Sequence, residues 1–188
     1  MNWMKKVAVA LVCLLPLGLQ AAKVDTLQVK SPSMNKSIEV VVVSPDMAAT
    51  EACPVIYLLH GYGGNARTWV GIKPDLPKIA DEKGIFFVCP DGKNTWYWDS
   101  PLNADVRYET FISDELVKYV DSHYKTVADR KGRAITGLSM GGHGAMWNGL
   151  RHSDVFSAAG STSGGVDIRP FPKNWEMSVQ IGEKAKYP

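Results

Sequence analysis

The chain has 188 residues, of which 45% are hydrophobic and 21% are charged, and its formal net charge is +2. This composition is ordinary for a soluble globular protein, and the small net charge argues against a nucleic-acid partner. The length fits a single domain with a hydrophobic core of its own.

Residues 1–22 have the features of a secretory signal peptide: two lysines, an apolar stretch at 7–15 and an exit of small residues. The apolar stretch is short for a membrane span and is followed by Pro16, so a retained anchor is the weaker alternative. We therefore expect residues 23–188 to form the mature domain. It should be secreted or periplasmic, without a stable membrane anchor.

Hydrophobic periodicity and turn residues predict strands alternating with helices along the rest of the chain. In chain order, we expect strands at 23–29, 37–43 and 54–59, a helix at 75–83, a strand at 86–89, a helix at 108–124, a strand at 133–136, a helix at 142–150 and a strand at 156–161. This alternation predicts an α/β fold with a mostly parallel sheet and flanking helices.

A GxSxG pattern formed by Gly137, Ser139 and Gly141 lies where a predicted strand passes into a predicted helix. A nucleophilic serine at such a turn has a strained backbone, and side chains at the two glycine positions would collide there. Free N–H groups at the helix start, first that of Met140, can stabilise negative charge on a substrate. We interpret the pattern as a nucleophile elbow around Ser139. The alternative is a glycine-rich turn that only lets two elements pack.

A second glycine-rich loop, HGYGG at 60–64, follows the predicted strand at 54–59. In the α/β-hydrolase plan, the corresponding loop supplies another N–H group to the oxyanion hole. We expect the Tyr62 N–H to take this role. His60 is expected to pack the loop and not to act as the catalytic base.

Further motifs extend this pattern over the chain from about Ser37 onward. They are LLHGYGG at 58–64, Trp69, CPDG at 89–92, WYWDSP at 96–101, YETFISDEL at 108–116 and GLSMGGHGA at 137–145. Together they make the chain resemble the putative esterase family, which includes esterase D or S-formylglutathione hydrolase, tributyrin esterases, feruloyl and acetyl-xylan esterases, and mycolyltransferases of the antigen 85 type. The resemblance implies an α/β-hydrolase fold, a serine carboxylesterase with Ser139 as nucleophile, and an oxyanion hole formed by Tyr62 and Met140.

Three consecutive aromatic residues, Trp96, Tyr97 and Trp98, follow a predicted strand end, where the sites of open parallel sheets are built. We expect at least one of them to be partly exposed, and Trp96 and Trp98 to contact an acylated carbohydrate. A loop fixed by tryptophan packing is the alternative.

The sequence contains no CxxC or HExxH pattern, and its four histidines are scattered. We therefore predict no metal and no organic cofactor, and a small-molecule or polysaccharide ester as the partner. Cys53 and Cys89 are expected near opposite ends of parallel strands, as two separate buried thiols.

The catalytic acid and histidine of α/β-hydrolases come after the nucleophile in the chain. Here His123, His143 and His152 are expected to be structural or solvent-facing, and Asp167 to be a solvated loop residue. No acid and histidine can thus be assigned, and we expect the chain to be the C-terminally truncated, N-terminal portion of a longer esterase and a poor catalyst by itself.

Three functions are consistent with these features. The leading hypothesis is a secreted serine esterase that acts through an acyl-enzyme. An acyltransferase would use the same residues with a sugar hydroxyl in place of water. A non-catalytic carbohydrate-binding remnant would keep the binding pocket but not the catalytic triad.

Overall fold

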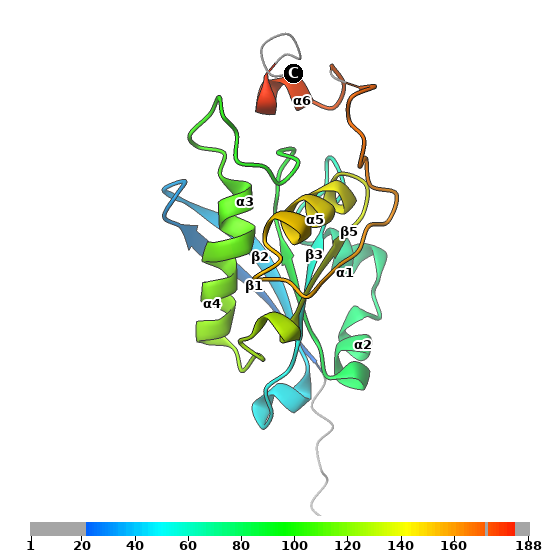
Figure 1. The fold of residues 1–188 in the computed structure, drawn as a ribbon. Coiled ribbons are helices and arrows are strands. Elements are labelled where there is room, and N and C mark those ends of the chain that lie inside the picture. The colour runs from blue at the N-terminus through cyan, green and yellow to red at the C-terminus, as the bar shows by residue number, and fades with distance from the viewer. Residues whose placement is uncertain (1–21, 172, 183–188) are drawn as a thin grey trace, which may run out of the picture.

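The computed structural model describes residues 22–171 and 173–182. The predicted signal peptide therefore lies outside the described residues, apart from its last residue. A six-stranded sheet forms the centre of the domain, with helices on both of its faces (Figure 1). The strands are β1 (Lys23–Ser31), β2 (Lys36–Ser44), β3 (Val55–Leu59), β4 (Phe86–Pro90), β5 (Arg133–Gly137) and β6 (Ala158–Ala159).

The strand order is β1-β2-β4-β3-β5-β6. Strand β2 pairs antiparallel with β1 and β4, whereas β4, β3, β5 and β6 are parallel to one another. The predicted mostly parallel sheet is confirmed. Because these four strands are parallel, their carboxyl ends lie at the same end of the sheet, and the loops that follow them meet there.

The helices are α1 (Thr68–Ile72), α2 (Leu76–Lys83), α3 (Tyr108–Thr110), α4 (Leu116–His123), α5 (Met140–Arg151) and α6 (Met177–Ile181). Two 3-10 helices add Asp46–Ala49 and Arg130–Gly132, and a π-helical turn at Phe111–Glu115 joins α3 to α4. The predicted helix at 108–124 is thus one continuous helical segment with a π turn inside it.

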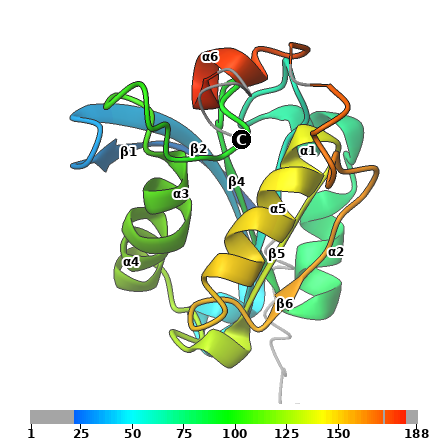
Figure 2. The ribbon, with the colours of Figure 1, turned by 45° about the horizontal axis from the view of Figure 1, so that its top comes forward.

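Two apolar layers bury the sheet. Alternate residues of β2, such as Val40 and Val42, point into a core shared with α4 and α5, and Val41 and Val43 point into a second core shared with α2. The period-two alternation of strand side chains produces this division. Figure 2 shows α4 and α5 on one face and α1 and α2 on the other.

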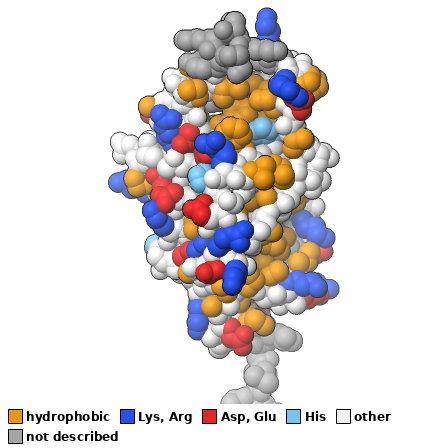
Figure 3. All heavy atoms as spheres, viewed as in Figure 1, with side chains coloured by type: hydrophobic (Ala, Val, Ile, Leu, Met, Phe, Trp, Pro, Cys, Tyr) orange, Lys and Arg blue, Asp and Glu red, His pale blue; other side chains and the backbone are white. Residues whose placement is uncertain are grey.

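Strand β6 is shorter than the predicted strand at 156–161. Only Ala158 and Ala159 form ladder pairs with β5, and within the described residues no strand pairs with the outer edge of β6. The outer face of α5 leaves Trp147 and Leu150 exposed, at 37% and 72% of their surface. Figure 3 shows hydrophobic side chains gathered on this face of the molecule.

Candidate active site

Ser139 stands between β5 and α5 with φ 54° and ψ −116°, outside the regions that non-glycine residues favour. Its side chain is exposed, and its N–H donates to the Thr162 carbonyl over 2.9 Å. A Cβ atom at Gly141 would overlap the backbone of Leu59, and one at Gly137 would overlap the backbone of Gly141. The strained serine and the two glycines therefore have the geometry of a nucleophile elbow.

The HGYGG loop lies directly beside the elbow. A Cβ atom at Gly61 would be 3.5 Å from the Ser139 Cβ. The loop is fixed from the far side by Asn94, whose Oδ1 accepts from the Gly63 N–H over 2.8 Å. Within the described residues, neither the Tyr62 N–H nor the Met140 N–H has a hydrogen-bond acceptor. Both donors are thus free for a negatively charged oxygen.

His60 is buried beneath this loop. Its Nε2 accepts from the Gly92 N–H over 2.9 Å, so the ring proton is on Nδ1, which donates to the Gly61 carbonyl over 2.7 Å. Both ring nitrogens therefore hold backbone groups of two loops. This arrangement agrees with the loop-packing role expected for His60.

Asp91 supports the same corner of the site. Its carboxylate contacts the Lys93 ammonium over 2.6 Å and lies 3.5 Å from the His60 ring. Burial alone raises the pKa of the Asp91 carboxyl, but the hydrogen bonds that it accepts from the Lys93 ammonium and the Lys93 backbone N–H outweigh burial and hold this pKa at about 2.

His152 and His123 contact groups other than Ser139. His152 Nε2 lies 2.9 Å from the Glu109 carboxylate, which also accepts from Trp147 Nε1 and Arg151 Nε. Burial raises the pKa of Glu109, and its three donors more than compensate, so that the pKa is lowered.

His123 lies on the exposed end of α4 and stacks on Tyr119. No histidine side chain hydrogen-bonds to the Ser139 Oγ in the described structure.

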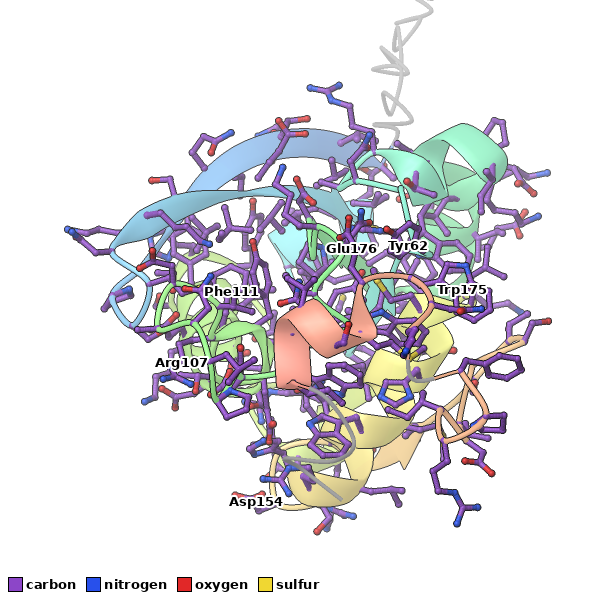
Figure 4. All side chains as sticks on the ribbon, turned by 90° about the horizontal axis from the view of Figure 1, so that it is seen from above. Tyr62, Arg107, Phe111, Asp154, Trp175 and Glu176 are labelled. Carbon is purple, nitrogen blue, oxygen red and sulfur yellow. The ribbon has the colours of Figure 1, made fainter. Side chains whose placement is uncertain are left out.

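A cavity of about 170 Å3 opens beside Ser139. Most of its wall comes from the irregular segment after β6, which we call the strap: residues 163–171 and 173–182. The lining residues are Tyr62, Trp96, Ser139, Ser163, Gly165, Asp167, Ile168, Phe171, Trp175 and Met177. Figure 4 looks down on this region and shows Tyr62 and Glu176 next to each other beside α6.

The aromatic loop differs from the prediction. Trp96, Tyr97 and Trp98 are all buried, with at most 4% of their surface exposed, so the expectation of an exposed aromatic residue was wrong. Trp96 and Tyr97 both have a left-handed backbone, with φ of 59° and 61°, and this tight path directs successive side chains inward. Trp96 lines the cavity, whereas Trp98 does not. The Trp98 ring stacks on the Trp96 ring, with 5.6 Å between the two ring centroids.

The strap residues Ile168, Phe171 and Trp175 were not recognised in the sequence, although two aromatic residues in an irregular segment after the elbow were a usable signal. Asp167 is exposed and pairs with Arg169, whose guanidinium lowers the pKa of Asp167 to about 2. It was expected to be a solvated loop residue, and it is one.

Cys53 and Cys89 are free and buried, as expected. Within the described residues, no group of three or more His, Cys, Asp or Glu side chains is arranged to hold a metal ion. The same part of the chain contains no helix that is long and apolar enough to span a membrane.

Comparison with known proteins agrees with this geometry. The family described as "Putative esterase" matches residues 31–186. The chain belongs to this esterase family.

Two curated relatives and one solved structure illustrate the range of this family. An esterase of Mycobacterium tuberculosis (strain H37Rv) is 30% identical over 149 residues, which cover 76% of this chain and 32% of that protein. The diacylglycerol acyltransferase/mycolyltransferase Ag85A of Mycobacterium leprae is 32% identical over 158 residues, which cover 77% and 44%. A solved ferulic acid esterase superposes with a TM-score of 0.71 and 30% identity, covering 89% of this chain and 70% of that one.

The family member described here therefore spans less than half the length of these curated relatives. The family contains esterases and acyltransferases, and the α/β-hydrolase fold is shared with the solved ferulic acid esterase.

Proposed function

We propose that this chain carries the nucleophile, the oxyanion hole and the acyl pocket of a serine carboxylic-ester hydrolase. The observation that carries the proposal is the exposed, strained Ser139 beside the two free N–H groups of Tyr62 and Met140. Ser139 Oγ would attack the ester carbonyl, and the two N–H groups would stabilise the oxyanion. The alcohol leaves, and water then releases the acid from the acyl-enzyme.

The proposal assigns no catalytic base within this chain. A serine hydroxyl needs a base within hydrogen-bond reach, and no histidine here hydrogen-bonds to the Ser139 Oγ. Reaction with activated probes is therefore the appropriate first test.

The test is covalent labelling of the full chain with a fluorophosphonate, followed by mass spectrometry. Ser139 Oγ should displace fluoride and add one phosphonyl group, and Ser139→Ala should show no adduct. Ser153→Ala, which removes an exposed hydroxyl at the far end of α5, is the matched control and should label like the wild type. An adduct on Ser139→Ala equal to that on the wild type contradicts the proposal.

We further propose that the acyl group is short or contains a single ring. A cavity of about 150 Å3 accepts one benzene ring, so the 170 Å3 cavity here suits such a group and not a long acyl chain. Aromatic side chains of Trp96, Phe171 and Trp175 line it, which favours stacking on a phenolic ring. The solved ferulic acid esterase supports this choice.

A pair of alanine variants tests this acyl site. Phe171 lines the cavity and Leu102 does not, yet the two side chains are equally exposed, at 45% and 46%. Phe171→Ala should weaken ferulate binding about fivefold in calorimetry, because it removes one aromatic wall. Leu102→Ala should leave binding unchanged. Equal affinities in both variants would contradict the assignment of the cavity.

The alcohol portion is proposed to be a carbohydrate met outside the cytoplasm, in agreement with the predicted signal peptide. Mass analysis of the exported protein should show a start near residue 22 or 23. Product analysis with and without an added sugar separates hydrolysis from acyl transfer, because only a transferase passes the acyl group to the sugar hydroxyl.

A further inference from the structure

His143 lies one turn after Ser139 on α5, buried between the aromatic loop and the strap, with 7% of its surface exposed. The proposed chemistry does not use it. Its ring makes edge contacts with Trp96 and Trp98, at 5.3 and 5.1 Å between centroids. The side chain thus lies at the junction of two walls of the acyl cavity.

Both ring nitrogens of His143 are engaged. An indole N–H can only donate, and Trp98 Nε1 lies 3.0 Å from His143 Nε2, so Nε2 is unprotonated. The proton is therefore on Nδ1, which donates to the Gly165 carbonyl over 2.7 Å. Burial lowers the pKa of the ring, with the Gly165 contact opposing that effect, and the net shift favours the neutral form.

The two partners of His143 belong to opposite walls. Gly165 lines the cavity from the strap, and Trp98 stacks on Trp96, which lines the cavity from the aromatic loop. Gly165 also lies close to Trp96, since a Cβ atom at this glycine would be 3.5 Å from the Trp96 ring. Because the His143 side chain is hydrogen-bonded to Trp98 and to Gly165, it fixes the distance between the two walls of the cavity.

We propose, on the basis of the acyl site proposed above, that His143 is a positioning residue that sets the width of the acyl cavity and thereby its selectivity for a ring-containing acyl group. It does so as the neutral Nδ1–H tautomer, through Trp98 on one side and Gly165 on the other. In this arrangement His143 does not act as the catalytic base, because both of its ring nitrogens are hydrogen-bonded and neither can take a proton from Ser139.

Side-chain replacements can remove the two bonds separately. His143→Asn keeps a donor near the Nδ1 position and loses the acceptor for Trp98, whereas His143→Gln keeps an acceptor near the Nε2 position and loses the donor to Gly165. His143→Leu removes both, and Trp98→Phe removes the indole donor from the other side. His123→Leu, on the exposed end of α4, is the control.

Calorimetry with ferulate and with acetate on the full chain gives the first readout. His143→Leu should weaken ferulate binding about tenfold and acetate binding less than about twofold, because only the larger ligand needs both walls in place. The Asn, Gln and Trp98→Phe variants should each weaken ferulate about threefold. They carry the test if His143→Leu does not fold. His123→Leu should bind as the wild type does.

Long-range 1H–15N NMR at neutral pH gives the second readout. It distinguishes a histidine whose tautomer is fixed by the two hydrogen bonds from one that is only packed. The expected result is a proton on Nδ1 of His143 and none on Nε2. A proton on Nε2, or ferulate binding within twofold of wild type in a folded His143→Leu variant, overturns the inference. If the wild type binds no ferulate at all, the acyl site itself fails, and that outcome is distinct from a His143 variant with wild-type affinity.

Discussion

The elbow and the strap border the same cavity, yet they are held in place by opposite means. At the elbow, backbone packs directly on backbone, and glycines at positions 137 and 141 leave no room for a methyl group. From Gly165 onward, the strap is held by the burial of Met177 and by side chains of other elements that donate to its main-chain carbonyls. Trp96 Nε1 donates to Trp175, His143 Nδ1 to Gly165 and Ser100 Oγ to Gln180.

This difference shows where sequence change is tolerated. Contact between backbones cannot adjust when a side chain is added, because the atoms involved belong to β3 and α5. The strap carbonyls are present whatever side chains the strap carries. Substitutions that disturb the backbone packing of the elbow or the hydrogen bonds of the strap therefore test this difference directly.

The largest effect is expected from Gly141→Ala. A Cβ atom at Gly141 would overlap the Leu59 backbone, so the elbow must move, and the free energy of unfolding should fall by about 3 kcal/mol or more. Gly71→Ala is the control, because nothing lies within 4 Å of a Cβ atom there. Denaturant unfolding measures both. A Gly141→Ala variant as stable as Gly71→Ala would show that the elbow backbone is adjustable.

A smaller effect is expected at Asp91, which lies beside the buried His60 ring at the start of the HGYGG loop. Its pKa in the folded state is about 2, below the unfolded value near 3.9, so its stabilisation is present above the unfolded pKa and is lost as the pH falls from about 5 to about 2. Asp91→Asn should therefore cost about 2 kcal/mol at pH 7 and flatten the stability profile in that range.

Unfolding measured at several pH values tests this prediction, with the exposed Asp154→Asn as control. Parallel acid profiles for Asp91→Asn and the wild type would show that Asp91 does not provide the stabilisation.

The smallest effect is expected on the strap side. Ser100 is fully buried, and its Oγ donates to Gln180 and accepts from Leu102 and Asn103. Ser100→Ala should destabilise the strap by about 1 kcal/mol, because these bonds are lost. Hydrogen exchange should therefore be faster in α6 while β3 and β5 keep their protection.

The exposed Ser153→Ala is the control for this measurement. Faster exchange throughout the sheet in Ser100→Ala would show that the strap and the elbow do not differ in the way described.

Most of the sheet and the elbow could be predicted from the sequence because their determinants are local. The strand at 133–136 and the helix at 142–150 agree with β5 and α5 to within two residues, and glycine spacing alone located the turn between them. The same holds for the HGYGG loop. The two oxyanion donors remain proposals, but the structure leaves both free.

The burial of the aromatic loop could not be predicted, because it depends on two consecutive left-handed residues at Trp96 and Tyr97 and on a hydrogen bond to Trp175 of the strap, 79 residues after Trp96. Neither leaves a periodic pattern. The strap itself was missed for the same reason, since its attachment uses main-chain carbonyls that every sequence has. Helix α1, a single short turn of five residues, also lacked a pattern long enough to recognise.

Attachment through main-chain carbonyls makes the strap a natural site for protein engineering. Phe171 and Trp175 line the cavity and are exposed, and neither side chain makes one of the three hydrogen bonds that hold the strap. A library randomised at these two positions would change the shape of the cavity beside Ser139 while the frame of the cavity stays in place. New acyl preferences should be reachable there without compensating changes elsewhere in the domain.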